Sequence, residues 1–197
     1  MTPPDRLLDI SVRELAAQIA AETPSPASGS TAAVVATLSS ALVAMAARFS
    51  RREWPDAGGV VAQAEALRNR AAPLAQLDAE AYEAVLAVRR ASKGAPEAER
   101  DAALGRALSR AADVPLAIAE IAADVAELAA LVAEKGNPNV SGDAAAAAVL
   151  ADGAARAAAT LVAINLGTTE EDERGVRAQR LVESAREAAR RAVAAAS

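Results

Sequence analysis

The stretch that decides the fold runs from Ser30 to Ala47 and reads STAAVVATLSSALVAMAA. It carries no charge, and on a helix of 3.6 residues per turn its apolar side chains cover nearly the whole circumference. A second such stretch, from Ala144 to Leu166, is interrupted by Asp152 and Arg156, which are spaced as an ion pair within one helix. Because Ala, Ser and Thr outnumber Leu and Ile in them, these stretches indicate central helices of a bundle and not membrane spans.

The composition excludes several classes of function. The 197 residues include no cysteine and no histidine, which excludes disulfides, zinc sites built on these ligands and catalytic triads with a histidine base. The net charge of −5 disfavours nucleic acid as a partner, and the first residues lack the basic-then-apolar layout of a signal peptide. We expect one cytoplasmic domain spanning residues 1–197, with no metal, no cofactor and no membrane partner.

Periodicity and chain breakers divide the sequence into helices. Apolar residues make up 53% of the chain and aromatic residues only 2%, so the interior must consist mainly of Ala, Val and Leu, which favours helices packed closely on one another. No segment has the pattern of a strand hairpin. The sequence predicts an all-α antiparallel bundle with long, partly Ala-rich central helices. The expected helices span residues 11–22, 30–51, 60–91, 97–112, 113–135 and 144–166, with a final helix after residue 168.

Short polar motifs mark the expected helix starts. Ser11 with Glu14 forms a capping box, and Thr168 with Glu171 forms another. Asp143 suits the N-cap of the Ala-rich helix. One bundle of this size has difficulty burying two helices that are apolar nearly all round, so we expect a homodimer formed through helices.

Asp78 is the most informative charged residue. A heptad-like pattern over residues 60–91 assigns its position to the core, together with Ala71 and Val85. A buried carboxylate is either paired with a cation or retained for chemistry, so a salt bridge to an arginine of a neighbouring helix is the structural alternative to a functional role. Tyr82 lies one turn later on the same face and is either a core tyrosine or the border of the same pocket.

Three further groups are candidates for ligand binding, and each has a plain structural alternative. Ser28, Gly29 and Ser30 open a helix whose free N–H groups can bind an anion, although small polar residues are also ordinary caps. Asn137 and Asp143 belong to a loop that offers amides and a carboxylate, or a simple turn and cap. Arg51 and Arg52 lie beside Phe49 and Trp54 and suit a flat anionic ligand, or form a solvated helix end.

Taken in order, these motifs resemble the cyclodeaminase/cyclohydrolase family. That family comprises the C-terminal domain of formiminotransferase-cyclodeaminase and stand-alone bacterial methenyltetrahydrofolate cyclohydrolases. The resemblance covers about residues 10 to 185, and no single motif is specific by itself. The matching segments are Thr23–Ser30, Ala41–Met45, Leu77–Tyr82, Lys93, Val114–Glu120, Gly136–Asn139 with Asp143, and Ile164–Leu166.

The resemblance implies an all-α homodimer that acts on a tetrahydrofolate derivative and needs no other cofactor. The family's reactions are the hydrolysis of 5,10-methenyl-tetrahydrofolate to 10-formyl-tetrahydrofolate and the release of ammonia from 5-formimino-tetrahydrofolate. Asp78 would stabilise the cationic reacting carbon and handle protons. Asn137, the second catalytic candidate, and the turn at Ser28–Ser30 would orient the pterin and the reacting carbon, and Arg51, Arg52 or Lys93 would bind the glutamate tail.

The sequence also departs from the family's usual pattern. Ala27-Ser28-Gly29-Ser30 replaces a Gly-Gly-Gly-Ser turn, Gly142-Asp143 replaces a Ser-Asp pair, and Leu161 replaces an asparagine. Because these changes remove or shift polar contacts, a second hypothesis is a catalytically degenerate homodimer that binds folate or is purely structural.

Overall fold

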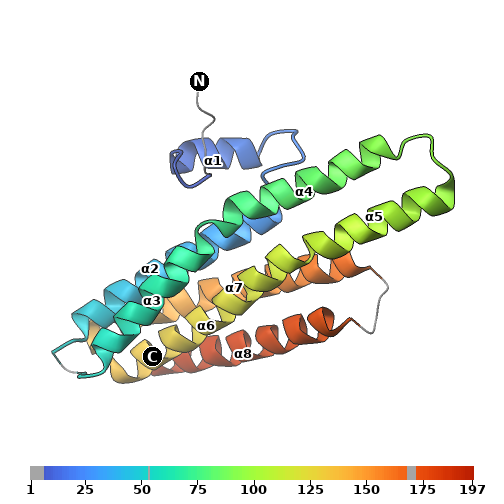
Figure 1. The fold of residues 1–197 in the computed structure, drawn as a ribbon. Coiled ribbons are helices and arrows are strands. Elements are labelled where there is room, and N and C mark those ends of the chain that lie inside the picture. The colour runs from blue at the N-terminus through green and yellow to red at the C-terminus, as the bar shows by residue number, and fades with distance from the viewer. Residues whose placement is uncertain (1–6, 53, 168–171) are drawn as a thin grey trace.

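The computed structural model describes residues 7–52, 54–167 and 172–197, and every regular element among them is a helix (Figure 1). Long helices lie side by side, and the α4–α5 hairpin projects beyond the ends of α7 and α8. The elements are α1 (Val12–Ile19), α2 (Ser28–Phe49), α3 (Ala57–Ala71), α4 (Leu74–Ala91), α5 (Glu97–Ala111), α6 (Asp113–Lys135), the short 3-10 helix η1 (Pro138–Val140), α7 (Ser141–Leu166) and α8 (Glu173–Ala195).

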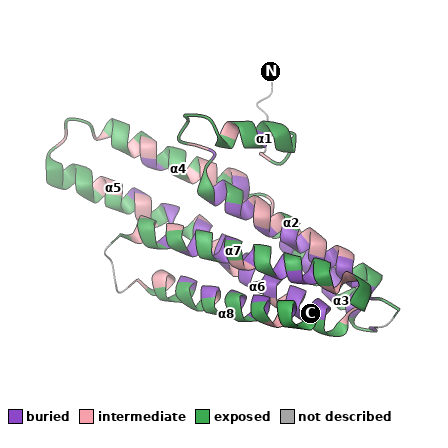
Figure 2. Cartoon of the chain, turned by 180° about the vertical axis from the view of Figure 1, so that it is seen from behind, coloured by how far each residue is buried: buried purple, intermediate pink, exposed green. Residues whose placement is uncertain are grey.

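Alanine fills most of the interior. Helices α6, α7 and α8 pack on one another, and α7 also packs on α2. The buried stripes of α2 and α7 consist largely of alanine, and Val43, Val125, Val132 and Ile118 are among the largest side chains that are fully buried. A methyl side chain lets helix backbones approach closely, which explains how a chain with so few aromatic residues forms a core (Figure 2).

The expected helix over residues 60–91 is wrong, because the structure has two helices there. Helix α3 ends at Ala71 and α4 begins at Leu74, with Pro73 at the break. Proline has no N–H to donate, and its ring clashes with the preceding turn of a helix. The break lets the two segments take different partners: α3 packs mainly on α2, while α4 packs on α2 and α5.

The helix starts agree only in part with the expected caps. Ser11 caps α1 as predicted, because its side chain accepts from the backbone N–H of Glu14. The N-cap expected at Asp143 is wrong: α7 begins at Ser141, directly after η1, and Asp143 lies inside its first turn. Thr168 and Glu171 lie outside the described residues. Asp172 caps α8 by accepting from the N–H of Arg174.

Two segments are long and apolar enough, by length and composition alone, to cross a membrane. They are Ser28–Phe49 and Pro138–Leu166, of whose most apolar windows 61% and 44% are buried in the bundle. The start of α2 lies beside the end of α7, and Ser50, just after α2, contacts Asn137, just before η1 and α7. The two helices therefore pack along each other, as the core helices of a bundle do.

Candidate functional site

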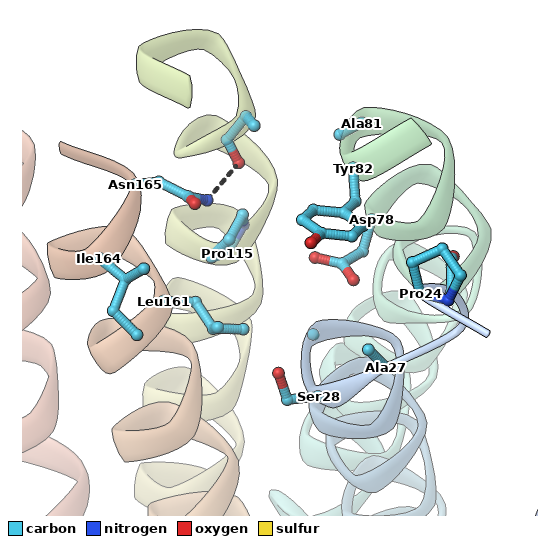
Figure 3. A pocket seen from close by; sticks show the side chains of 13 residues that line it. Pro24, Ala27, Ser28, Asp78, Ala81, Tyr82, Pro115, Leu161, Ile164 and Asn165 are labelled. Carbon is cyan, nitrogen blue, oxygen red and sulfur yellow. Dashed lines mark hydrogen bonds between the residues drawn. The ribbon is translucent and has the colours of Figure 1, made fainter. Parts of the chain in front are cut away.

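A pocket of about 250 Å³ lies where four parts of the chain meet (Figure 3). The loop before α2 and the first turn of α2 form one side, α4 forms the second, the junction of α5 and α6 the third, and the last turns of α7 the fourth. Of the described residues that line it, only Asp78 carries a charge. The lining residues are Pro24, Ser25, Ala27, Ser28, Gly29, Asp78, Ala81, Tyr82, Ala111, Pro115, Leu161, Ile164 and Asn165.

The Asp78 carboxylate lies against the N-terminus of α2. A side chain on Gly29 would overlap both of its oxygens, so only glycine allows α2 to approach this closely. Ala27, the N-cap residue, has no side chain that can cap the helix. The first turn of α2 has free N–H groups and a partial positive charge, and Asp78 supplies a negative charge there from another helix.

Asp78 has no ion pair with any described residue, so the structural alternative of a salt bridge to an arginine receives no support. The Ser30 hydroxyl donates to the carbonyl of Ala75 at 2.7 Å and lies 3.4 Å from Oδ2 of Asp78. Because a hydroxyl has one proton, its contact with the carboxylate is weak. Burial raises the pKa of the Asp78 carboxyl above its ordinary value, and the hydrogen bonds from Ser30 oppose that rise.

Tyr82 and Ser28 line the same pocket as Asp78, which for Tyr82 is one of the two alternatives that the sequence left open. Figure 3 shows Tyr82 and Asp78 reaching in from α4, with the Ser28 hydroxyl at the start of α2. Tyr82 is 43% exposed, which excludes the alternative of a core tyrosine. Leu161, Ile164 and Pro115 add apolar surface across from them. The pocket therefore combines the carboxylate of Asp78 and the hydroxyls of Ser28 and Tyr82 with an apolar wall that suits a flat ring.

Asn165 is a pocket residue that sequence reasoning did not select. Its side-chain amide nitrogen donates to the backbone carbonyl of Ala111 at 3.2 Å, across the junction of α5 and α6. Two signals were present in the sequence: Asn165 belongs to the Ile164–Leu166 motif, and Pro115 marks a break that leaves a carbonyl without its helical donor. Joining them requires knowledge that α7 ends beside that break.

Four predicted site residues, the catalytic candidate Asn137 among them, lie at the other end of α2. Asn137 donates its backbone N–H to the Ser50 hydroxyl at 2.8 Å and its side-chain amide to the carbonyl of Phe49 at 3.2 Å. Arg51 and Arg52 come directly after Ser50 in the chain, and both are exposed. Asp143 lies in the first turn of α7. At 1.5 Å per residue, the length of α2 separates this group from Ser28 by about 32 Å. One chain therefore does not bring Asn137, Arg51, Arg52 and Asp143 to Asp78.

The loop at Asn137 is built for contact with α2. A Cβ on Gly136 would lie 2.5 Å from both the Ser50 hydroxyl and the carbonyl of Val132, so glycine is required by close approach and not by a left-handed backbone. The hydrogen bonds of Asn137 thus have a structural role, and its predicted catalytic role stays a prediction.

Lys93 lies beyond the pocket. It follows the C-cap of α4 in the exposed turn that leads to α5. Fifteen residues separate it from Asp78, or about 22 Å of helix. Of the ten residues predicted for the site, the structure gathers Asp78, Ser28, Gly29, Ser30 and Tyr82.

Comparison with known proteins agrees with this architecture. The model of the formiminotransferase-cyclodeaminase family matches residues 11–191. Methenyltetrahydrofolate cyclohydrolase of Methylorubrum extorquens is 34% identical over 155 residues, covering 75% of this chain and 74% of that protein. Formimidoyltransferase-cyclodeaminase of Rattus norvegicus is 30% identical over 179 residues, which cover 86% of this chain and 33% of that longer protein.

A solved structure has the same fold. The crystal structure of formiminotetrahydrofolate cyclodeaminase from Thermotoga maritima superimposes with a TM-score of 0.80 at 26% identity, over 94% of this chain and 95% of the other. The fold and pocket define an all-α helical module with a half-buried carboxylate in a pocket between its helices. The chain belongs to the formiminotransferase-cyclodeaminase family, as its sequence motifs indicated.

Proposed function

We propose that this chain is a folate one-carbon enzyme that hydrolyses 5,10-methenyl-tetrahydrofolate to 10-formyl-tetrahydrofolate or forms the methenyl compound from 5-formimino-tetrahydrofolate with release of ammonia. The observation that carries the proposal is the Asp78 carboxylate, which is half-buried, lacks a cationic partner among the described residues and lies in a pocket with an apolar wall. Such a site favours a ligand that brings its own positive charge. The relatives with these two activities support the choice of substrate.

The hydrolysis uses Asp78 as counter-charge and base. The methenyl carbon bridges N5 and N10 of the folate and shares one positive charge with them. A water molecule attacks this carbon, a C–O bond forms, and the released proton passes to the carboxylate. The C–N5 bond then breaks, N5 keeps the electron pair and takes the hydroxyl proton, and the 10-formyl product leaves with one net proton released to solvent.

The same groups serve the release of ammonia. N10 attacks the carbon of the protonated formimino group on N5, whose terminal nitrogen carries two hydrogens and whose positive charge faces Asp78, and N10 loses its proton to the carboxylate. The carbon–nitrogen bond to the terminal nitrogen then breaks, and that nitrogen leaves as ammonia with the proton that Asp78 returns. Both routes place a cationic carbon beside Asp78, which is the reason that one pocket suits both reactions.

An absorbance assay tests the proposal, because the methenyl compound absorbs in the near ultraviolet. Purified protein should accelerate the loss of this absorbance from 5,10-methenyl-tetrahydrofolate or its appearance from 5-formimino-tetrahydrofolate. The Asp78→Asn variant is the control for contaminating activity. Binding of reduced folates without turnover of either substrate would instead indicate the catalytically degenerate homodimer.

We also propose that the chain is a cytoplasmic homodimer that pairs through the outer faces of α2 and α7. Leu38 and Phe49 on α2 are 56% and 62% exposed, and Ile164 on α7 is 64% exposed. A groove of about 630 Å³, lined mainly by apolar residues such as Val35 and Val149, runs between these helices beside α1. Large apolar surface of this kind indicates a protein interface, and a second copy of the same face is the simplest occupant. Light scattering should give twice the chain mass, and Leu38→Glu should give a monomer.

A further inference from the structure

Pro115 leaves one carbonyl of the pocket wall without a donor. In a continuous helix the carbonyl of Ala111 would accept from the N–H of the residue four positions later, but that residue is Pro115, which has none. Ala111 ends α5, and Pro115 lies in the first turn of α6. Asn165 of α7 fills this gap by donating its side-chain amide to the Ala111 carbonyl at 3.2 Å.

This hydrogen bond fixes which way the Asn165 amide faces. A carbonyl only accepts, so the nitrogen of the amide must face Ala111, and the oxygen Oδ1 must face the other way. Asn165 lines the pocket, and Figure 3 shows its side chain across from Asp78 and Tyr82. No other described residue donates to its amide. The pocket therefore presents a neutral, oriented acceptor on the wall opposite its carboxylate.

We infer that Asn165 Oδ1 accepts an N–H from the aminopyrimidine edge of the pterin ring and so selects the ligand. The inference rests on the proposed function and adds a recognition role to it. At about 250 Å³ the pocket is smaller than most sites that enclose a whole ligand, so it suits a bicyclic ring whose tail lies outside. Leu161, Ile164 and Pro115 cover the faces of such a ring, and Asn165 Oδ1 offers its N–H edge an acceptor that has no charge to desolvate.

Pro115 acts in this scheme as a positioning residue. Pro115→Ala supplies a backbone N–H that can satisfy Ala111 within the helix. Asn165 then loses its fixed partner, and its amide is free to turn. The variant should weaken ligand selectivity although the Asn165 side chain itself is unchanged.

The test compares binding of 5-formyl-tetrahydrofolate with its 2-desamino analogue by calorimetry. The wild type should bind the analogue about fivefold more weakly, the loss expected for one hydrogen bond. Asn165→Leu, which keeps the branched shape but has no acceptor, should bind both compounds equally, and the selectivity of Pro115→Ala should lie between those of Asn165→Leu and the wild type. Asn69→Leu, the same change on the exposed side of α3, is the matched control and should keep the wild-type ratio.

Several outcomes would overturn the inference. Unchanged selectivity in Asn165→Leu shows that Oδ1 does not contact this edge, and loss of selectivity in Asp78→Asn instead assigns the edge to the carboxylate. If Asn165→Leu does not fold, Pro115→Ala takes its place in the test, and a selectivity equal to that of the wild type in this variant overturns the inference. Failure of the wild type to bind either compound overturns the proposed function as well, whereas binding with turnover and no selectivity overturns only the role of Asn165.

Discussion

Asp78 combines two demands that usually conflict. Its carboxylate complements the partial positive charge at the start of α2, and its burial makes the ionised form costly. The first demand explains why the residue is tolerated in a core stripe, and the second makes it a stronger base than an exposed aspartate. A substitution that removes the charge of Asp78 and keeps its shape can therefore distinguish its structural role from its chemical role.

Asp78→Asn should therefore fold and bind folate but turn over about 10²–10³ times more slowly, the usual loss for one well-placed electrostatic group. The wild-type kcat/KM should fall as pH drops through the Asp78 pKa, which lies above its ordinary value of 3.8, and the variant should lack this acid limb. A raised carboxyl pKa also means that folding stability declines as pH rises from 3.8 through the folded pKa. The variant should lose that decline, so melting at pH 7 well below the wild type would assign Asp78 a mainly structural role.

Gly29→Ala should separate stability from activity. Alanine favours the helix by about 1 kcal/mol, but its Cβ would occupy the space of the Asp78 carboxylate. We expect little loss of stability and at least a tenfold loss of turnover, measured by thermal melting and the absorbance assay. Gly105→Ala in α5, where a Cβ meets nothing within 4 Å, is the control and should raise stability without changing turnover.

The sequence indicated for a local reason that Asp78 faces inward, whereas its contact with the start of α2 joins distant parts of the chain and was missed. The heptad-like pattern alone places position 78 on the buried face of a helix. The partner is the start of α2, 48 positions away in the chain, and nothing local shows that these two elements cross. Asn165 was missed in the same way, because its partner, Ala111, lies on an element joined to it only by the fold.

At the scale of helices, the sequence predicted most elements but not the contacts between them. Glu120 and Glu127 of α6 lie opposite the apolar stripe of their helix, and they pair with Arg177 and Arg191 of α8. Periodicity assigns a residue to one face of its helix. It does not tell whether a neighbouring helix places charged side chains next to that face. Pro73 was missed for a related reason, since the apolar pattern continues in phase across it.

Arg174 ties the start of α8 to the pocket wall. Its guanidinium donates to the carbonyl and hydroxyl of Ser109 at 2.7 and 2.8 Å and also to Asp113 and Asp172. Hydrogen bonds from Arg174 lower the pKa of Asp172 to about 2. The contribution of the Asp172–Arg174 pair to folding stability is therefore complete above pH 3.8 and is lost as pH falls toward 2.

Arg174→Gln should lower the urea midpoint of unfolding at pH 5. The difference between the midpoints of the variant and the wild type should become smaller as pH falls toward 2, because Asp172 is then protonated in both proteins. Arg180→Gln, an exposed arginine of the same helix without an ion pair among the described residues, is the control. A wild-type midpoint in Arg174→Gln at pH 5 would show that this network does not hold α8.

At the scale of the whole molecule, the predicted site residues fall into two groups at opposite ends of α2. Asp78, Ser28 and Tyr82 line the pocket, whereas Arg51 and Arg52 lie about 32 Å away. In the proposed dimer, two copies that pair through α2 in antiparallel orientation, about a twofold axis near Leu38, would place one group against the other. The all-α fold, which depends on short-range patterns, was predicted correctly, whereas the dimer that we propose to complete the site depends on contacts between chains that no short-range pattern specifies.

Mixing two inactive variants tests this arrangement. Asp78→Asn has no base, and the double variant Arg51→Gln, Arg52→Gln should bind the glutamate tail poorly and turn over slowly at low substrate. If the groups act across the dimer, half of the mixed dimers are hybrids with one intact site, so about a quarter of wild-type activity should return after the two are unfolded and refolded together. No recovery, or full activity of the arginine variant alone, contradicts shared sites.

The alanine interior has a mechanical consequence. Alanine has no rotamers, so the contacts among α2, α6, α7 and α8 have almost no side-chain freedom with which to absorb a disturbance. A displacement at one end of such a helix is carried along its length as the movement of a rigid rod. Ligand binding in the pocket at the start of α2 should consequently shift the other end of that helix, where Phe49 and Ser50 contact Asn137, although no ligand atom reaches this end.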